Sequence, residues 1–114
     1  MTQNPILESI VLELRRGMLV LAVMAQLEQE QYGYSLIKHL SERGLEIDQG
    51  TLYPLLRRLE SQGLLESAWR LDDPRPRRYY VLSSEGRKLL PQLKEEWNQM
   101  VTLMEKILEK EKDQ

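Results

Sequence analysis

A chain of 114 residues is long enough to bury one modest core and too short for two, so we expect a single domain with at most one appended segment. It contains no cysteine and a single histidine, His39, which excludes disulfides, thiolate metal sites and a multi-histidine metal site. The net charge of -2 argues against indiscriminate binding to nucleic acid, but basic residues are concentrated between Arg75 and Lys88.

Several classes of protein are disfavoured by what the sequence lacks. The first residues carry neither a basic region nor a small-residue cleavage site, so we expect no secretory signal. The longest apolar run, Met18 to Ala25, is less than half as long as a bilayer-spanning helix. Glycine-rich phosphate loops, metal-ligand clusters and activated-nucleophile patterns do not occur. We therefore expect a cytoplasmic protein that has no cofactor, metal or membrane partner and is not an enzyme.

The first predicted helix begins at Pro5, a residue that suits the first helical position. Its apolar residues recur at helical spacing: Ile6, Leu7, Ile10, Val11 and Leu14. The apolar run from Met18 to Ala25 predicts a buried helical stretch directly afterwards. Gly17 lies between the two, where the helix could kink or divide.

A pair of shorter helices follows a turn through Gln31, Tyr32 and Gly33. The first is predicted from about Tyr34 to Arg43 and ends at Gly44, a residue suited to a left-handed cap. Residues 45–47 are compatible with a short extended piece.

Asp48 or Thr51 is expected to cap the next helix, which runs to about Gln62 and ends at Gly63. Pro54 must lie early in this helix or bend it, because it cannot donate to the preceding turn. Four of its leucines stand at helical spacing and form one core-facing stripe: Leu52, Leu55, Leu56 and Leu59.

The period then changes from helical to extended. Segments Leu64 to Leu71 and Arg77 to Leu82 predict a two-stranded hairpin, whose tip at residues 72–76 is rich in proline and aspartate. Tyr79 and Tyr80 alternate along the second strand, so one of them packs on the core. Ser83 or Ser84 is expected to cap a last helix that could reach Lys112. The predicted fold is mainly α with a small β-hairpin, in the order of a winged helix-turn-helix.

In such a fold the second helix of the pair enters the major groove of DNA. With the leucine stripe turned inward, the helix from Asp48 to Gln62 directs polar and basic side chains outward, and the preceding helix and the arginine-rich hairpin tip can reach phosphates. The candidate DNA-binding residues are Tyr34, Lys38, Gln49, Gly50, Thr51, Tyr53, Arg57, Arg58, Arg75, Arg77 and Arg78. Alternatively Arg57 and Arg58 only solubilise a surface, and Asp72 and Asp73 would oppose a DNA contact at the tip.

Five segments, in this order and with these gaps, resemble the PadR family of transcriptional regulators. They are YGYSLI (32–37), GTLYPLLRRLE (50–60), GLL (63–65), RRYYVL (77–82) and EGR (85–87). The resemblance implies a winged-helix domain with a long C-terminal dimerisation helix, which binds an inverted repeat in double-stranded DNA and usually represses a gene. It also implies release by a small aromatic effector. Two departures are Pro91, inside the last helix, and the segment before Leu14.

The last helix favours a homodimer independently of this resemblance. Its apolar residues alternate steps of three and four, which is the seam of a coiled coil: Leu90, Leu93, Trp97, Met100, Met104 and Ile107. The N-terminal helix is the expected surface to receive this seam, either within the subunit or across the two-fold axis. The alternative is that the last helix folds back on its own domain. We accordingly divide the chain into an N-terminal helix that supports the dimer (1–14), a winged-helix DNA-binding domain (15–83) and a dimerisation helix (84–114).

Trp97 and Met100 are the candidate effector-binding residues. Two copies of Trp97 across a two-fold axis could sandwich a planar aromatic ligand. The alternative is an ordinary interface tryptophan, and methionines also fill ordinary cores. For the whole protein, the alternative function is a winged-helix protein-interaction module that uses its basic face for an acidic partner.

Overall fold

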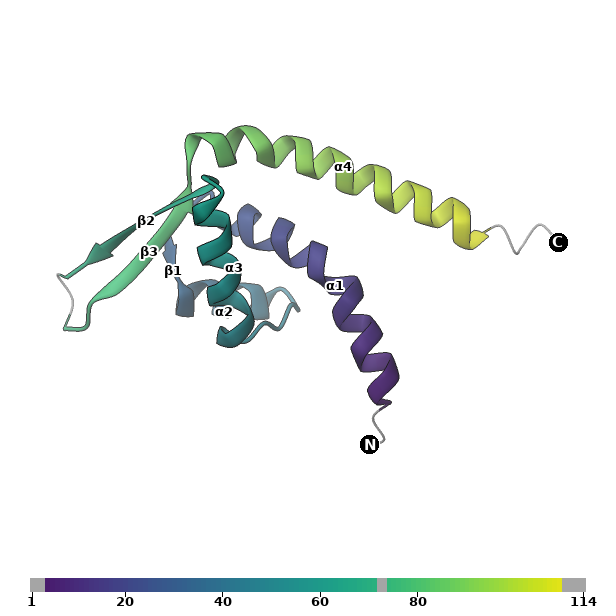
Figure 1. Cartoon of the computed structure of the whole chain (residues 1–114), viewed down its shortest axis with the longest axis horizontal. Helices are drawn as coiled ribbons and strands as arrows, with labels where there is room; N and C mark the ends of the chain where they lie inside the picture. Colours follow the sequence, from purple (N-terminus) through teal and green to yellow (C-terminus); the bar gives the residue numbers. More distant parts are fainter. Residues whose placement is uncertain (1–3, 72–73, 110–114) are drawn as a thin grey trace.

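Helix α1 (Pro5–Gln26) is the first element of the computed structural model, which describes residues 4–71 and 74–109. Asn4 caps its amino end: the Asn4 Oδ1 accepts hydrogen bonds from the N–H groups of Ile6 at 3.0 Å and Leu7 at 3.1 Å. Pro5 occupies the first helical position, as predicted. The two predicted helical stretches form one helix, whose axis changes direction near the middle (Figure 1).

Helices α2 (Gly33–Glu42) and α3 (Gln49–Ser61) form the predicted pair. Each is followed by a glycine with positive φ, +95° at Gly44 and +82° at Gly63, which confirms the predicted left-handed ends. The connection from residue 45 to 48 contains no strand. Asp48 is the residue that caps α3.

The hairpin of β2 (Leu65–Arg70) and β3 (Arg77–Leu82) has the predicted antiparallel pairing, and its tip residues Asp72 and Asp73 lie outside the described part of the chain. A third strand, β1 (Gln31–Tyr32), pairs with the other edge of β3, giving the order β1-β3-β2. The sequence predicted a turn at β1. Two residues are too few to show a strand period, so this edge strand depends on its pairing with β3.

Helix α4 (Ser84–Glu109) leaves the sheet at Ser83, which is the capping residue. The Ser83 Oγ accepts a hydrogen bond from the Gly86 N–H at 3.0 Å and donates to the Gly63 carbonyl at 2.6 Å. The helix continues through Pro91 as one element. Its predicted extension to Lys112 lies outside the described residues.

The core surrounds the leucine stripe of α3, whose four members are buried as predicted. Burial of a leucine side chain contributes about 1.5–3 kcal/mol, so this stripe is the strongest anchor of α3. Around it lie buried residues from α1, α2 and the sheet: Val23, Met24, Leu27, Leu36, Leu40, Leu65, Tyr80 and Leu82. Leu90 of α4 is also only 2% exposed. This corrects its assignment to the dimer seam, because Leu90 packs in the core of its own chain.

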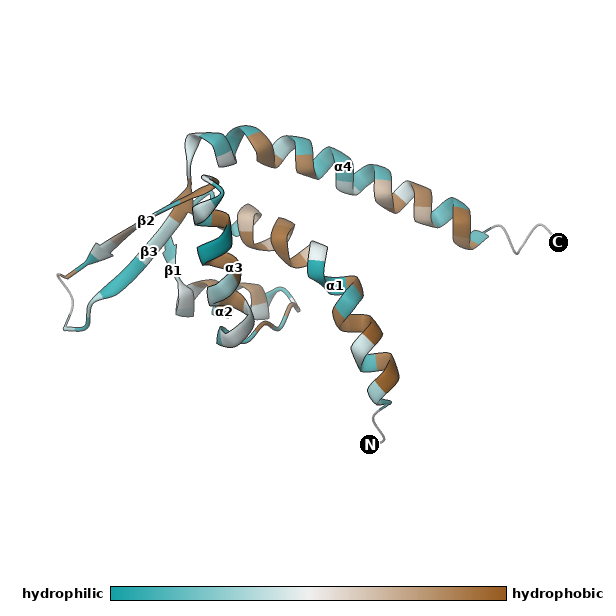
Figure 2. Cartoon of the chain, viewed as in Figure 1, coloured by the Kyte–Doolittle hydropathy of each residue, from teal (hydrophilic) through white to brown (hydrophobic). Residues whose placement is uncertain are grey.

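The molecule is more extended than a single compact domain. Its radius of gyration is 17.0 Å, whereas about 13 Å is typical of a compact chain of about 100 residues. The start of α1 and the end of α4 run apart from each other, and the wing, which is the β2–β3 hairpin, projects on the opposite side (Figure 1). Figure 2 shows hydrophobic residues along both helices where they diverge. Within residues 4–71 and 74–109, no helix combines the length and apolar character needed to cross a bilayer.

The first turn of α4 packs so closely on the chain after α3 that it requires glycine. A Cβ atom at Gly86 would overlap the Leu64 carbonyl oxygen and lie 3.0 Å from the Leu82 Cδ2. We expect Gly86→Ala to lower the free energy of unfolding by about 1–3 kcal/mol, measured by urea denaturation. Gly50→Ala is the matched control, because a Cβ in that first turn of α3 meets only an Asp48 oxygen at 3.6 Å. Equal urea midpoints for both variants would contradict the close contact.

Candidate nucleic-acid interface

Helix α3 turns one side to solvent because its leucines hold the other side in the core. Asp48 fixes the start of the helix: its Oδ1 accepts a hydrogen bond from the Thr51 N–H at 2.8 Å. Gln49 and Gly50 lie exposed in the first turn, and Arg57 lies exposed further along. This side therefore offers backbone and amide groups at the helix start and a cation beyond them.

Two adjoining hollows, each of about 360 Å³, lie beside α3 and the wing. The first is lined by Tyr32, Tyr34, Gln49, Arg75, Pro76 and Arg77. The second is lined by Tyr32, Gly33, Tyr53, Arg57, Trp69, Pro76, Arg77, Arg78 and Tyr80. Seven of the predicted DNA-binding residues thus line one continuous region. No acidic residue is among the described residues that line it.

Tyr53 lines this region but is half-buried, because its ring covers the start of α2. A Cβ atom at Gly33 would lie 2.8 Å from the Tyr53 Cε1, so a larger residue there would force the ring to move. The sequence placed Tyr53 off the leucine stripe, outside or on the flank of the helix, as a candidate DNA contact. In the structure Tyr53 also joins α3 to α2, so its removal would affect packing as well as any contact with DNA.

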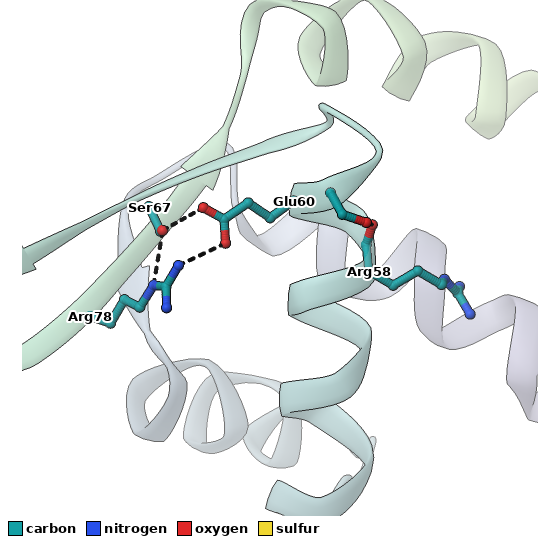
Figure 3. Close-up of polar contacts among 5 residues, drawn as sticks. Arg58, Glu60, Ser67 and Arg78 are labelled. Atoms are coloured by element: carbon teal, nitrogen blue, oxygen red, sulfur yellow. Dashed lines mark hydrogen bonds and ion pairs between the residues drawn. The ribbon is translucent and has the colours of Figure 1, made fainter.

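Four predicted residues line neither hollow. Gly50 is exposed at the amino end of α3, and Lys38 is exposed on α2. Thr51 lines a separate hollow with residues of α1, among them Arg15. Arg58 extends from α3 away from the wing (Figure 3). The sequence assigns Arg57 and Arg58 the same role. Their side chains nevertheless point in different directions, because consecutive residues of a helix are rotated by 100°.

The outer face of the wing carries stacked aromatic and cationic groups. The Arg77 guanidinium carbon lies 4.5 Å from the Tyr32 ring centroid, and the Tyr32 and Tyr79 rings meet edge to face at 5.3 Å. Tyr34 stacks beyond Tyr32 at 6.4 Å. Arg70 lies over Tyr79 at 4.6 Å and pairs with Glu30. Tyr32 was missed as a site residue because its role depends on the short strand β1.

The inner face of the wing runs from the core out to solvent. Tyr80 is the tyrosine that packs on the core, and burial raises the pKa of its hydroxyl while the Arg78 guanidinium beside it opposes that change. Further out, Arg78 lies opposite the exposed Trp69 in the strand register. Trp69 was also missed from the sequence, although alternation along β2 would have identified it once the register was known.

The predicted dimer and effector residues lie on the other side of the molecule, on α4. Leu93 is half-buried, whereas Trp97 is 40% exposed and the seam beyond it is exposed as well. The part of α4 from Trp97 to Glu109 therefore does not fold back on its own domain. Trp97 and Met100 border an apolar hollow of about 230 Å³ between α1 and α4, together with Leu14, Gly17, Met18, Val20, Leu21, Leu93 and Glu96.

Comparisons with known proteins agree on one family. Residues 20–92 match the model of the Transcriptional regulator PadR-like family. A transcriptional regulator of Mycobacterium tuberculosis is 44% identical over 63 residues, which span 55% of this chain and only 59% of that protein. The structure of a PadR family transcriptional regulator from Eggerthella lenta has a TM-score of 0.84 and 47% identity, covering 91% of this chain and 93% of that one. The structure of a PadR family transcription regulator from Clostridium difficile has a TM-score of 0.70 and 32% identity, covering 78% of this chain and 96% of that one.

Proposed function

The chain belongs to the PadR-like family of transcriptional regulators, and from this premise we propose that it is a repressor that occupies an operator in double-stranded DNA as a homodimer. The observation that carries the proposal is the region between α3 and the wing. Its described lining residues include four arginines and no carboxylate: Arg57, Arg75, Arg77 and Arg78. One of the four, Arg78, is paired with Glu60 of α3, so the proposal depends on the other three. Such a region attracts phosphates even though the whole chain has a net charge of -2.

In this proposal the amino end of α3 enters the major groove. Gln49 presents an amide that can pair with an adenine edge, and Gly50 allows the backbone to approach the bases. Arg57 reaches a phosphate further along the groove. Arg75 and Arg77, on the wing, bind phosphates or the neighbouring minor groove. Tyr34, at the start of α2, is exposed for a backbone contact.

We propose that a second copy covers the exposed seam of α4 and the apolar start of α1. Ile6, Leu7 and Ile10 are exposed on α1, as are Met104 and Ile107 on α4. A monomer rarely leaves so large an apolar surface in water, and the seam has the spacing of a helix that packs on another helix. The two-fold symmetry of such a dimer would place both α3 helices on half-sites about one DNA turn apart, on a palindromic operator.

The apolar hollow beside Trp97 supports a further part of the proposal, namely release by a small planar aromatic effector. The hollow lies between α1 and α4, the two helices that would form the dimer. A ligand there could change the angle between them and so the distance between the two α3 helices. It would release DNA only by its greater affinity for the altered dimer.

The test of DNA recognition compares two adjacent arginines of α3. Against a duplex with the native promoter, Arg57→Ala should weaken affinity by about 1–3 kcal/mol and lower the slope of log affinity against log salt by about one, because one phosphate contact is lost. Fluorescence anisotropy with labelled duplex over a range of salt measures both. Arg58→Ala removes the same charge from the other side of α3 and should leave both values unchanged.

The outcome also separates DNA recognition from the protein-interaction alternative. If the wild-type protein binds promoter and random duplex equally weakly, the repressor proposal is wrong. An acidic protein partner would then be the better candidate for this surface.

The dimer is tested by a charge on the seam. Wild-type protein should sediment at twice its monomer mass of 13.5 kDa. Met104→Glu places two carboxylates near the two-fold axis and should shift the protein to monomers and weaken operator binding. Gln99→Glu adds the same charge off the seam and should leave the dimer intact. A Met104→Glu variant that remains fully dimeric would exclude this seam as the interface.

The effector is tested through tryptophan emission. Planar aromatic compounds should quench the wild-type protein, and Trp97→Phe should lose this quenching while Trp69 still reports on the wing. The same compounds should raise the operator concentration needed for half-saturation. A compound that quenches without changing operator affinity would leave Trp97 as an interface residue with no effector role.

A further inference from the structure

Three polar side chains form a closed ring of hydrogen bonds between α3 and the wing (Figure 3). The Ser67 hydroxyl donates to the Glu60 Oε2 at 2.6 Å, and the Arg78 Nη2 donates to the Glu60 Oε1 at 3.1 Å. The Arg78 Nε donates to the Ser67 Oγ at 3.0 Å and completes the ring. We call these three residues the triad. It joins the last part of α3 to both strands of the hairpin.

The triad lies where the apolar core ends. On the inner face of the wing, Leu82 and Tyr80 are buried, whereas the next residue outward on that face is Arg78. The side chains of Glu60 and Arg78 are 27% and 40% exposed, so the pair is only partly shielded from solvent. As far out as Tyr80, the inner face of the wing contacts α3 through apolar packing. Beyond Tyr80 the contact consists of these charge-assisted hydrogen bonds, a type that is stronger than a neutral hydrogen bond.

The triad also changes what the second hollow offers to DNA. Arg57 and Arg78 both line this hollow, from α3 and from the wing. Glu60 neutralises Arg78 through the ion pair, whereas among the described residues Arg57 forms no ion pair with a carboxylate. The two cations therefore differ: one faces the hollow with its full charge, and the other is already paired.

We propose that the triad sets the spacing between α3 and the wing and keeps the Arg78 charge from DNA phosphates, which makes Glu60 a specificity-determining positioning residue. This inference rests on the proposed DNA-binding function. Non-specific affinity for DNA comes from the number of phosphates neutralised, whereas preference for an operator comes from correctly placed contacts. Pairing of Arg78 with Glu60 therefore lowers non-specific affinity for DNA. By holding the wing in place, the same pairing raises the preference for an operator.

The test uses salt dependence on a random duplex and on the promoter duplex. Glu60→Gln removes the carboxylate charge and frees Arg78, so affinity for random duplex should rise several-fold, with a salt slope steeper by about one. Preference for the promoter should fall. Glu85→Gln is the matched control, since it removes the same charge from an exposed pair with Lys88 on α4, and it should change neither slope.

The double variant Glu60→Gln with Arg78→Gln separates positioning from direct contact. Because the pair is neutral as a whole, its removal should leave the random-duplex slope at the wild-type value while promoter preference falls several-fold. If Arg78 bound a phosphate itself, the slope would instead decrease by about one. That decrease, or a Glu60→Gln variant that behaves like Glu85→Gln, would overturn the proposal.

A measurement without DNA distinguishes failure of this inference from failure of the proposed function. In a Trp97→Phe background Trp69 is the only tryptophan, and it lies opposite Arg78 on the wing. Glu60→Ala, which removes both acceptors, should make the time-resolved anisotropy of Trp69 decay faster at unchanged helix content. Unchanged anisotropy would show that the triad does not hold the wing. A wild-type protein without promoter preference would refute the repressor proposal alone.

Discussion

Burial of the leucine stripe fixes the orientation of α3, and the other features of the interface follow from that orientation. With Leu52, Leu56 and Leu59 almost fully buried, rotation of this helix would expose apolar area at a cost of several kcal/mol. The opposite side is therefore held toward solvent beside the wing. Asp48 sets where the helix begins, and Gly63 sets where the chain turns into the hairpin. Local capping and core burial thus place the exposed residues before any contact with a partner.

Features that depend on short-range chemistry were predictable from the sequence. The leucine spacing, the two left-handed glycines and the limits of β3 require only local pattern and backbone geometry. Features that depend on tertiary contacts could not be predicted from the sequence. The ring of Tyr53 over Gly33 joins residues 20 positions apart, and the pairing of Glu60 with Arg78 spans 18 positions. Leu90 continues the spacing of the α4 seam, so the pattern alone cannot show where the core ends and an exposed surface begins.

The two ends of the molecule have different physical characters. Between α3 and the wing, exposed groups are cationic, aromatic and amide, which suits a charged and hydrated partner. Along α1 and α4, a stripe of large apolar side chains is exposed among charged ones, which suits the face of another helix. Separation of these surfaces would allow a dimer to form through one while both copies of the other remain accessible. In such an arrangement the helices that join two copies would also set the distance between the two α3 helices, which is how an event at one surface could influence the other.

The central claim is that α3 and the wing act together as one DNA-binding surface. Backbone amide chemical shifts, recorded as promoter duplex is added to the isotopically labelled protein, test it most directly. We predict the largest changes at the amino ends of α2 and α3 and at Arg75 and Arg77, with random duplex shifting the wing more than the start of α3. Changes confined to α1 and α4, with α3 unperturbed at saturating duplex, would contradict the claim.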